Sequence, residues 1–360
     1  MSDAEQFFRP EINSLPTYGA GKNSSDPQII KVASNEMPFP TLAQVQAALA
    51  GALGGLNVYP DASAACPIEE IAHFHSVSPQ RIAVSNGSVA AIEKILSAVC
   101  TQGSEVIMPW RSFEAYPITI QLAGAVAKPV ALRADGNNDL RAMLGAITPR
   151  TRAVLICTPN NPTSAALTHS EVRDFIARVP GNIPVLLDEA YVDFVEMDDP
   201  VRGIELTEQF PNLIDLRTFS KAYSLAGIRC GYMIASEDVI ATIRKAATPF
   251  EVNALAQVAA RSALQSRSEV ERRVSIIKRE RTNLQNALHA LGWEIPTPQG
   301  NFVWFNFGVH SSLFAQICLE HGIIVRPFEA EGVRVTIGEP EAQLRLLRAL
   351  AEFRSRTETD

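Results

Sequence analysis

The chain lacks the features that mark several specialised classes of protein. Its five cysteines are scattered at positions 66, 100, 157, 230 and 318, without the paired spacing of a zinc site or a disulfide framework, so we expect reduced thiols. No uninterrupted apolar run reaches membrane-spanning length. The polar start Met1-Ser-Asp-Ala-Glu-Gln has no signal-peptide pattern. These absences predict a cytoplasmic protein without a membrane partner.

Positive charge and metal ligands are scarce as well. The net charge of −7 leaves no basic footprint, which argues against nucleic acid as a partner. His73 and His75 have no clustered carboxylate or thiol beside them, so they indicate an exposed pair on a helix and not a metal site. The turn Ser85-Asn-Gly-Ser88 does not continue as Gly-x-Gly-x-x-Gly, the motif expected of a dinucleotide-binding protein.

What the chain does contain is a long alternation of strand-like and helix-like segments. At 360 residues, of which 46% are hydrophobic and 20% charged, it is long enough for a large domain with a real core plus a smaller domain. Apolar runs alternate with helical patterns, one of which opens with the capping-box spacing Thr168-His-Ser-Glu171. The runs lie at 81–84, 105–108, 153–157, 184–187, 213–216 and 231–235. This alternation predicts an α/β fold with a mostly parallel sheet covered by helices.

The expected organisation has three parts. Residues 1–30 form a polar arm, residues 31–245 the large domain, and residues 246–360 a smaller α+β domain. In the last part we expect helices at about 252–265 and 268–291, the second ending at Gly292, and a final helix from Glu339 to about Phe353. Short strands are expected between them at 302–307, 323–326 and 333–337. The second helix is long and strongly charged, so it is expected to link the domains.

The most informative segment runs from Thr218 to Tyr232. Lys221 stands there among small and apolar residues, and a dry pocket disfavours the ammonium form, so the neutral amine can attack a carbonyl. Arg229, with the hydroxyls of Thr218 and Ser220, can hold a phosphate nearby. Together these residues suit an aldehyde that carries a phosphate, and pyridoxal phosphate is the common cofactor of that description.

Further polar residues follow the predicted strands, where ligands gather in an open parallel sheet. Ser85-Asn-Gly-Ser88 ends a strand and opens a helix, so free N–H groups and the helix dipole can cradle a phosphate there. Asn161, in Thr158-Pro-Asn-Asn-Pro162, can donate to a phenolate oxygen on the cofactor ring. Taken alone, the two segments can also be explained as a glycine turn and a proline-stiffened turn.

Asp188 and two aromatic residues complete the set. Asp188 ends a predicted buried strand and needs a partner. A pyridinium N–H would supply one, while the carboxylate would keep that ring nitrogen protonated; capping of the strand end is the alternative. Tyr191 can reach the same ring oxygen as Asn161. Phe113 can stack on the ring, although aromatic residues at this spacing are commonly part of a core.

These residues occur in the order found in the fold type I pyridoxal-phosphate aminotransferases, which the chain resembles from Ser34-Asn-Glu36 to Arg334-Val-Thr-Ile-Gly338. The resemblance is closest to the histidinol-phosphate and aromatic aminotransferase branch, and it implies the large domain and the smaller C-terminal domain of that fold. The motifs that carry it are Ser220-Lys-x5-Gly-x-Arg229, Asp188-Glu-Ala-Tyr191, Trp110-Arg-Ser-Phe-Glu-Ala-Tyr116 and Arg217-Thr-Phe-Ser-Lys-Ala-Tyr223. The last two are similar to the actinobacterial aromatic, or phenylalanine, aminotransferases.

The resemblance implies a role for each residue. Lys221 would form the Schiff base with the cofactor and move the proton, and Asp188 would pair with the pyridine nitrogen. The ring oxygen would be held by Asn161 and Tyr191, and the ring face by Phe113. The residues implied to bind phosphate are Gly87, Ser88, Thr218, Ser220, Arg229 and, from the neighbouring subunit of a homodimer with shared sites, Tyr59. Those implied on the substrate side are Arg334, which would bind the carboxylate, together with Tyr18 and Asn35.

Three positions depart from the family pattern. Val89-Ala90 stands where many relatives carry an acidic residue, Ser164 replaces a glycine, and Asn35-Glu-Met-Pro-Phe39 lacks the common Asn-Pro-x-Gly continuation. None of them touches Lys221, Asp188 or Arg229, so the expected reaction class is unaffected.

The resemblance implies transfer of the amino group of an aromatic amino acid (Phe, Tyr or Trp) to 2-oxoglutarate, with ping-pong kinetics. Histidinol phosphate is the alternative substrate, because Arg334 can hold a phosphate ester as well as a carboxylate. A lyase or decarboxylase on the same fold is a more distant alternative, since Arg334 would bind a carboxylate that the reaction keeps. Arg326, in Val325-Arg-Pro-Phe328, can add a further donor or form a surface or interdomain ion pair.

Overall fold

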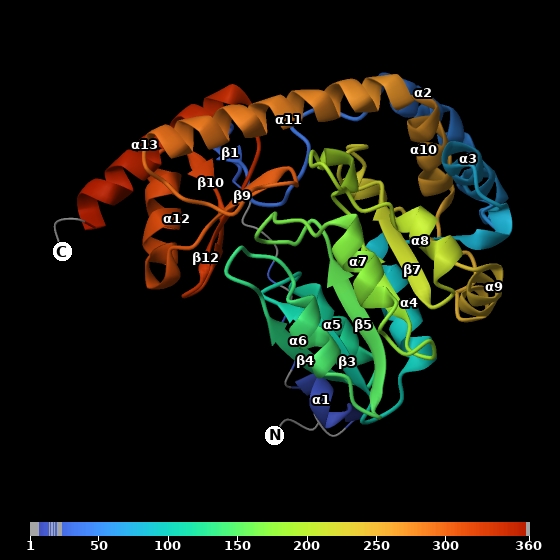
Figure 1. Cartoon of the computed structure of the whole chain (residues 1–360). Helices are drawn as coiled ribbons and strands as arrows, with labels where there is room; N and C mark the ends of the chain where they lie inside the picture. The colour runs from blue at the N-terminus through green and yellow to red at the C-terminus, as the bar shows by residue number, and fades with distance from the viewer. Residues whose placement is uncertain (1–6, 14, 16, 18, 20–23, 358–360) are drawn as a thin grey trace.

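The computed structural model describes residues 7–13, 15, 17, 19 and 24–357. Its centre is a seven-stranded sheet with the strand order β2-β8-β7-β6-β5-β3-β4 (Figure 1). The strands are β2 (Ile82–Ser85), β3 (Glu105–Trp110), β4 (Val126–Ala131), β5 (Thr151–Cys157), β6 (Val185–Asp188), β7 (Leu213–Thr218) and β8 (Gly231–Ile234). Six of these strands run in the same direction and β8 alone runs in the opposite direction, so the prediction of a mostly parallel sheet is confirmed.

The central strands are apolar over most of their length because both faces of the sheet are covered. Successive side chains of a strand point to opposite faces. Leu155 accordingly packs in one core cluster, whereas Val154 and Ile156 pack in another. The first cluster lies under α4 (Ser88–Val99), α5 (Ala115–Leu122) and α9 (Glu237–Lys245), and the second under α6 (Leu140–Gly145), α7 (His169–Ile176) and α8 (Gly203–Gln209).

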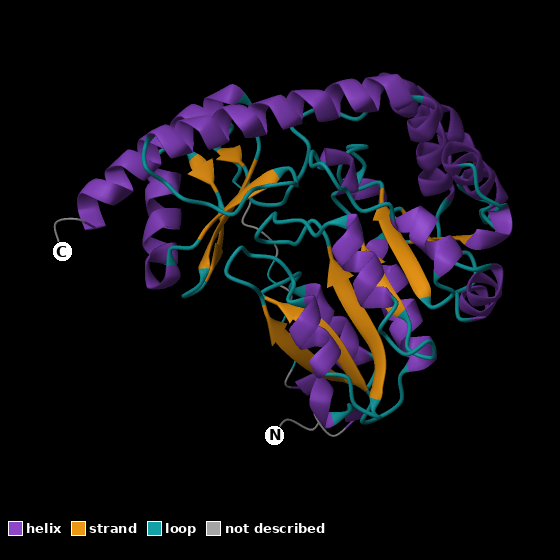
Figure 2. Cartoon of the chain, viewed as in Figure 1, coloured by secondary structure: helices purple, strands orange, loops and turns teal. Residues whose placement is uncertain are grey.

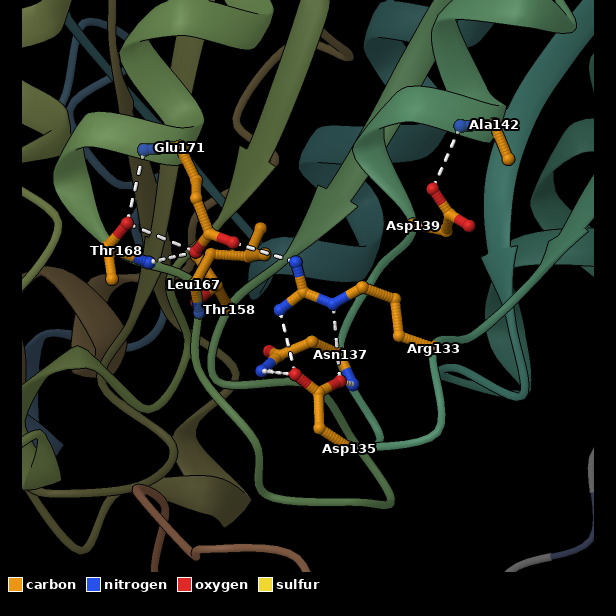
Figure 3. A network of polar contacts seen from close by, with 9 residues as sticks. All are labelled: Arg133, Asp135, Asn137, Asp139, Ala142, Thr158, Leu167, Thr168 and Glu171. Carbon is orange, nitrogen blue, oxygen red and sulfur yellow. Dashed lines mark hydrogen bonds and ion pairs between the residues drawn. The ribbon is translucent and has the colours of Figure 1, made fainter.

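The predicted capping box at the start of α7 is present (Figure 3). The Thr168 hydroxyl accepts from the Glu171 backbone N–H at 3.1 Å, and the Glu171 carboxylate accepts from the Thr168 backbone N–H at 2.9 Å. The other Glu171 oxygen accepts from Arg133 at 2.7 Å, and Arg133 also contacts Asp135. The network thus ties the loop after β4 to the first turn of α7.

The C-terminal part also follows the predicted elements. Helices α10 (Ala254–Gln265) and α11 (Arg267–Ala290) are followed by Gly292, whose φ of +74° is the left-handed conformation expected after a helix end. Helix α11 extends along the molecule from α2 (Ala43–Ala52) and α10 to the C-terminal strands (Figure 1). These strands form a second group, well separated from the central sheet (Figure 2).

The second group contains a three-stranded antiparallel sheet of β9 (Phe302–Phe305), β12 (Gly332–Thr336) and β11 (Arg326–Phe328), with α12 (Ser311–Glu320) and α13 (Pro340–Thr357) beside it. Beside it, β1 (Ile30–Lys31) pairs in parallel with β10 (Ile323–Ile324), so a segment from near the N-terminus contributes to this region. The division of the chain at residues 30 and 245 remains a prediction.

Some boundaries differ from the sequence predictions for local reasons. The helix expected from Ser112 begins at Ala115, because the preceding residues form the loop that leaves β3. The strand expected at 323–326 is split between β10 and β11, which belong to different sheets. Strand β4 was not predicted, because its edge position leaves much of it exposed and weakens its apolar pattern.

The structure also bears on the histidine pair and on membrane-spanning segments. His75, which ends α3 (Ala65–His75), is half-buried and lies 2.8 Å from the Tyr232 hydroxyl, so the expectation of an exposed histidine pair is wrong for this residue. Within the described ranges, no helix has both the length and the apolar character required to span a bilayer.

The fold places six strand ends along one edge of the central sheet. Strands β2, β3, β4, β5, β6 and β7 all point the same way, so their last residues lie on the same side. Ligands of open α/β sheets bind at this edge.

The capping box gives a prediction for stability. Replacement of Thr168 by Ala should remove the hydroxyl acceptor and lower the free energy of unfolding by about 1 kcal/mol. Thermal unfolding followed by circular dichroism should show a midpoint lower by roughly 2 °C. The matched control is Ser275→Ala on the exposed face of α11, where the hydroxyl only bonds back to the Glu271 carbonyl. Equal midpoints for the two variants would contradict the assigned role of Thr168.

Candidate active site

A cavity of about 190 Å³ lies at the carboxyl ends of the central strands. It brings together ten of the residues singled out in the sequence, from segments far apart in the chain. They are Ser88, Phe113, Asn161, Asp188, Tyr191, Thr218, Ser220, Lys221, Arg229 and Arg334. Arg334 comes from β12, so the C-terminal sheet forms one side of the cavity.

Lys221 follows the end of β7 and reaches into this cavity. Its Nζ donates to the Ser34 carbonyl at 3.2 Å and lies 5.5 Å from the centre of the Tyr191 ring. Burial, followed by the positive charge of Arg334, lowers the pKa of Lys221 to about 7. A large fraction of the amine is therefore neutral near pH 7, which is the form that attacks a carbonyl or accepts a proton.

Asp188, the last residue of β6, is a buried carboxylate with two bonds in the described structure. The Tyr116 hydroxyl donates to one oxygen at 2.7 Å, and the Ala190 backbone N–H donates to the other at 3.1 Å. Burial raises the pKa of Asp188 above its usual value, while the bond from Tyr116 acts in the opposite direction. A positively charged ring nitrogen in the cavity would stabilise this carboxylate.

Tyr116 is a site residue that the sequence analysis did not identify, since it entered only as part of an aromatic motif. It is fully buried in α5, and its hydroxyl needs a polar partner there. Its partner lies 72 residues further along the chain, which sequence spacing does not reveal. The one indication in the sequence was the aromatic motif, which places a tyrosine among apolar residues at the start of a helix.

The turn between β2 and α4 forms an anion cradle. Gly87 has a φ of +86°, and a Cβ at this position would lie 2.5 Å from an Arg229 guanidinium nitrogen. No side chain caps the start of α4, and Ser88 and Val89 line the cavity, so the first N–H groups of the helix and its dipole are available to an anion there. The Arg229 Nη1 donates to the Ser220 hydroxyl at 3.3 Å, and the Thr218 hydroxyl donates to the same oxygen at 2.9 Å. A guanidinium, two hydroxyls and a helix N-terminus suit a phosphate group.

The side-chain amides of Asn161 and Asn35 each form a hydrogen bond that orients a polar group of the cavity. Arg334 donates to the Asn161 side-chain oxygen and to the Ala33 carbonyl, both at 2.6 Å. This bond to the Asn161 oxygen fixes the orientation of the amide group. The Asn161 amide nitrogen can then donate to an oxygen in the cavity. The Asn35 amide donates to the Tyr191 hydroxyl at 2.9 Å, which orients that hydroxyl's own proton.

The remaining predicted residues lie elsewhere. Gly87 adjoins the cavity through Arg229, and Asn35 reaches it through Tyr191. Tyr59 is 78% exposed and stacks on Phe250 with ring centres 4.5 Å apart, so it does not line the cavity of its own chain. The prediction that it serves a neighbouring subunit stays a prediction. Tyr18 lies outside the described residues.

Arg326 is both a possible donor in the cavity and a member of an ion pair, the two alternatives that the sequence left open. It lines the cavity, and its Nη2 also donates to the two carboxylate oxygens of Glu114 at 2.8 and 3.1 Å. Glu114 lines the cavity as well and was not predicted as a site residue. The ion pair joins the loop before α5 to β11 of the C-terminal sheet.

These residues fit a flat, phosphate-bearing pyridine ring better than a metal ion. The cavity offers a buried carboxylate, an anion cradle and a lysine of lowered pKa, with the aromatic side chain of Phe113 on its wall. In the part of the chain that the structure covers, no three His, Cys, Asp or Glu side chains are grouped as a metal site would require.

Comparison with known proteins agrees with this geometry. Residues 27–350 match the family model "Aminotransferase class I and II". An aromatic amino acid aminotransferase of Streptomyces coelicolor is 42% identical, over 98% of this chain and 99% of that protein. Another, from Rhodococcus erythropolis, is 44% identical over 92% of each chain. The crystal structure of histidinol-phosphate aminotransferase from Sinorhizobium meliloti in complex with pyridoxal-5'-phosphate is 26% identical, with a TM-score of 0.86 over 97% of this chain and 98% of that one. The chain therefore belongs to the class I and II aminotransferase family and has its fold type I architecture.

Proposed function

We propose that this aminotransferase binds pyridoxal phosphate in the cavity and transfers the amino group of an aromatic amino acid to 2-oxoglutarate. The observation that supports it most is that Lys221, Asp188 and Arg229 line one cavity, with the lysine pKa lowered to about 7. The relatives that are more than 40% identical over nearly the whole chain are named aromatic amino acid aminotransferases, which favours aromatic substrates.

Each part of the cofactor has a complementary group in the cavity. The ring nitrogen would face Asp188, the ring oxygen would accept from Asn161 and Tyr191, and one ring face would meet Phe113. The phosphate would be bound by Gly87, Ser88, Thr218, Ser220 and Arg229, and by Tyr59 of a second subunit in a homodimer. When bound, pyridoxal phosphate supplies a ring that accepts the electron pair released at the substrate Cα.

The chain's own residues supply binding and proton transfer. Lys221, neutral for a large part of the time near pH 7, would take the proton from the substrate Cα and deliver it to the C4′ carbon of the cofactor, so that the amino group stays on the cofactor when the keto acid leaves. Arg334 binds the substrate carboxylate in a bidentate manner and fixes the substrate in place. Because this carboxylate is held and kept, transamination is favoured over decarboxylation. The two half-reactions use the same residues in turn, which predicts ping-pong kinetics.

Histidinol phosphate is the competing substrate. Arg334 does not discriminate against it, and a second guanidinium, that of Arg326, lines the same cavity. Arg326 is already bound by Glu114, however, which makes it a poorer anion site than an unpaired arginine. The turnover of phenylalanine compared with that of histidinol phosphate decides between the two.

The lysine assignment predicts the outcome of one substitution. Lys221→Ala should retain the fold and lower kcat with phenylalanine by roughly 10³-fold or more, because the variant has no amine to move the proton. Lys245→Ala, an exposed position on α9, is the control and should keep normal turnover. Near-normal turnover of Lys221→Ala, with circular dichroism unchanged, would refute the assignment.

The Tyr116 contact gives a second prediction, on cofactor affinity. Tyr116→Phe removes the bond that stabilises ionised Asp188, so the pKa of Asp188 should rise and its pairing with a ring nitrogen should weaken. The dissociation constant of pyridoxal phosphate, measured by absorbance titration of the apoprotein, should increase about tenfold. Tyr232→Phe removes another buried hydroxyl, the one beside His75, and should leave the constant within about twofold of wild type. An unchanged constant in Tyr116→Phe would contradict the role of this bond.

A further inference from the structure

Three arginines, two of which line the cavity, surround the aromatic ring of Phe328. The guanidinium carbons of Arg111, Arg326 and Arg334 lie 5.4, 5.6 and 5.8 Å from the centre of the Phe328 ring. Such a concentration of positive charge would by itself attract ligands that carry two anionic groups, such as a phosphate ester or a dicarboxylate. The partners of these arginines therefore matter for the choice of substrate.

Two of the three arginines are bound by a carboxylate. Arg111 pairs with Glu331 through two contacts, one of them a bond of 2.6 Å from its Nε. Arg326 pairs with Glu114 through both oxygens of the carboxylate. Arg334 donates to the side-chain oxygen of Asn161 and to the backbone carbonyl of Ala33.

The two carboxylates differ in position. Glu114 and Arg326 both line the cavity that contains Lys221, whereas Arg111 and Glu331 line a separate groove with Trp304 and Gln299. The side chains of Arg326 and Glu114 are only 15% and 29% exposed, so their attraction is weakened less by water than that of a surface pair. A ligand that enters the cavity meets the Glu114–Arg326 pair and not the Arg111–Glu331 pair.

This arrangement affects anionic and uncharged side chains differently. An anionic group must compete with Glu114 for the Arg326 guanidinium and must approach the Glu114 carboxylate, a like charge. An aromatic ring has no such competitor and can lie against the guanidinium plane or the apolar stem of Arg326. Discrimination of this kind works by opposing the wrong ligand as much as by binding the right one.

We propose that Glu114 adjusts specificity: by holding Arg326, it lowers the affinity of the cavity for ligands whose side chain carries an anion, the 2-oxoglutarate of the proposed function included, relative to that for aromatic amino acids. The inference rests on the proposed function, because it assumes that the substrate side chain points toward this pair. It assigns to Glu114 a role in the balance between substrates and none in proton transfer.

The test is Glu114→Gln, which keeps the size of the side chain and removes its charge. The ratio of kcat/KM for histidinol phosphate to that for phenylalanine should rise about tenfold, in line with one charge-assisted hydrogen bond. The dissociation constant of glutarate, measured by calorimetry on the holoenzyme, should fall by a similar factor relative to that of 3-phenylpropionate. Glu331→Gln, which frees Arg111 outside this cavity, is the matched control and should leave both ratios unchanged.

A second variant keeps the proposal falsifiable if Glu114→Gln does not fold. Arg326→Gln leaves the Glu114 carboxylate without its cation, so both ratios should move in the opposite direction, against anionic ligands. The proposal is overturned if a folded Glu114→Gln or Arg326→Gln variant keeps the wild-type ratios, or if Glu331→Gln shifts them equally. Absence of phenylalanine turnover in the wild type would instead refute the proposed function, and the glutarate measurement would still test Glu114.

Discussion

Burial of the Lys221 amine beside the guanidinium of Arg334 is the interaction on which the rest of the site depends. Removing an ammonium group from water and placing it near another cation both favour the neutral amine, and together they lower the pKa of Lys221 to about 7. This requires a site that is partly closed to water, and the central sheet helps to form it, because its strands are covered on both faces and end along one edge. The C-terminal sheet completes the enclosure by placing Arg334 on β12.

Positive and negative groups lie in different parts of the cavity, and each part suits a different part of a ligand. Arg229 and the start of α4 form a positive region suited to a phosphate, whereas Asp188 is a buried acid held by Tyr116. A buried carboxylate without a cation is costly, so Asp188 is best stabilised when a protonated ring nitrogen is bound. In the proposed complex, the ring nitrogen of pyridoxal phosphate would offset the burial that raises the pKa of Asp188, and this would favour binding of the cofactor.

Much of this could be predicted from the sequence, because local patterns govern the parts concerned. Apolar runs identify six of the seven strands of the central sheet, the capping box identifies the start of α7, and Lys221 and Arg229 lie in one short segment. Contacts between segments that are distant in the sequence could not be predicted in this way. The bond from Tyr116 to Asp188 and the ion pair of Glu114 with Arg326 join residues 72 and 212 positions apart, and no local pattern indicates them. The split of the strand expected at 323–326 has the same origin, since tertiary pairing decides which sheet each half joins.

The most direct test of the account is to locate the lysine that carries the cofactor. The purified holoenzyme would be treated with borohydride, which fixes a carbonyl compound bound to an amine, then digested and analysed by mass spectrometry. The account predicts that the pyridoxyl phosphate group is found on the peptide containing Lys221. Its presence on any other lysine, or the absence of a modified peptide from a protein with aminotransferase activity, would contradict the central claim.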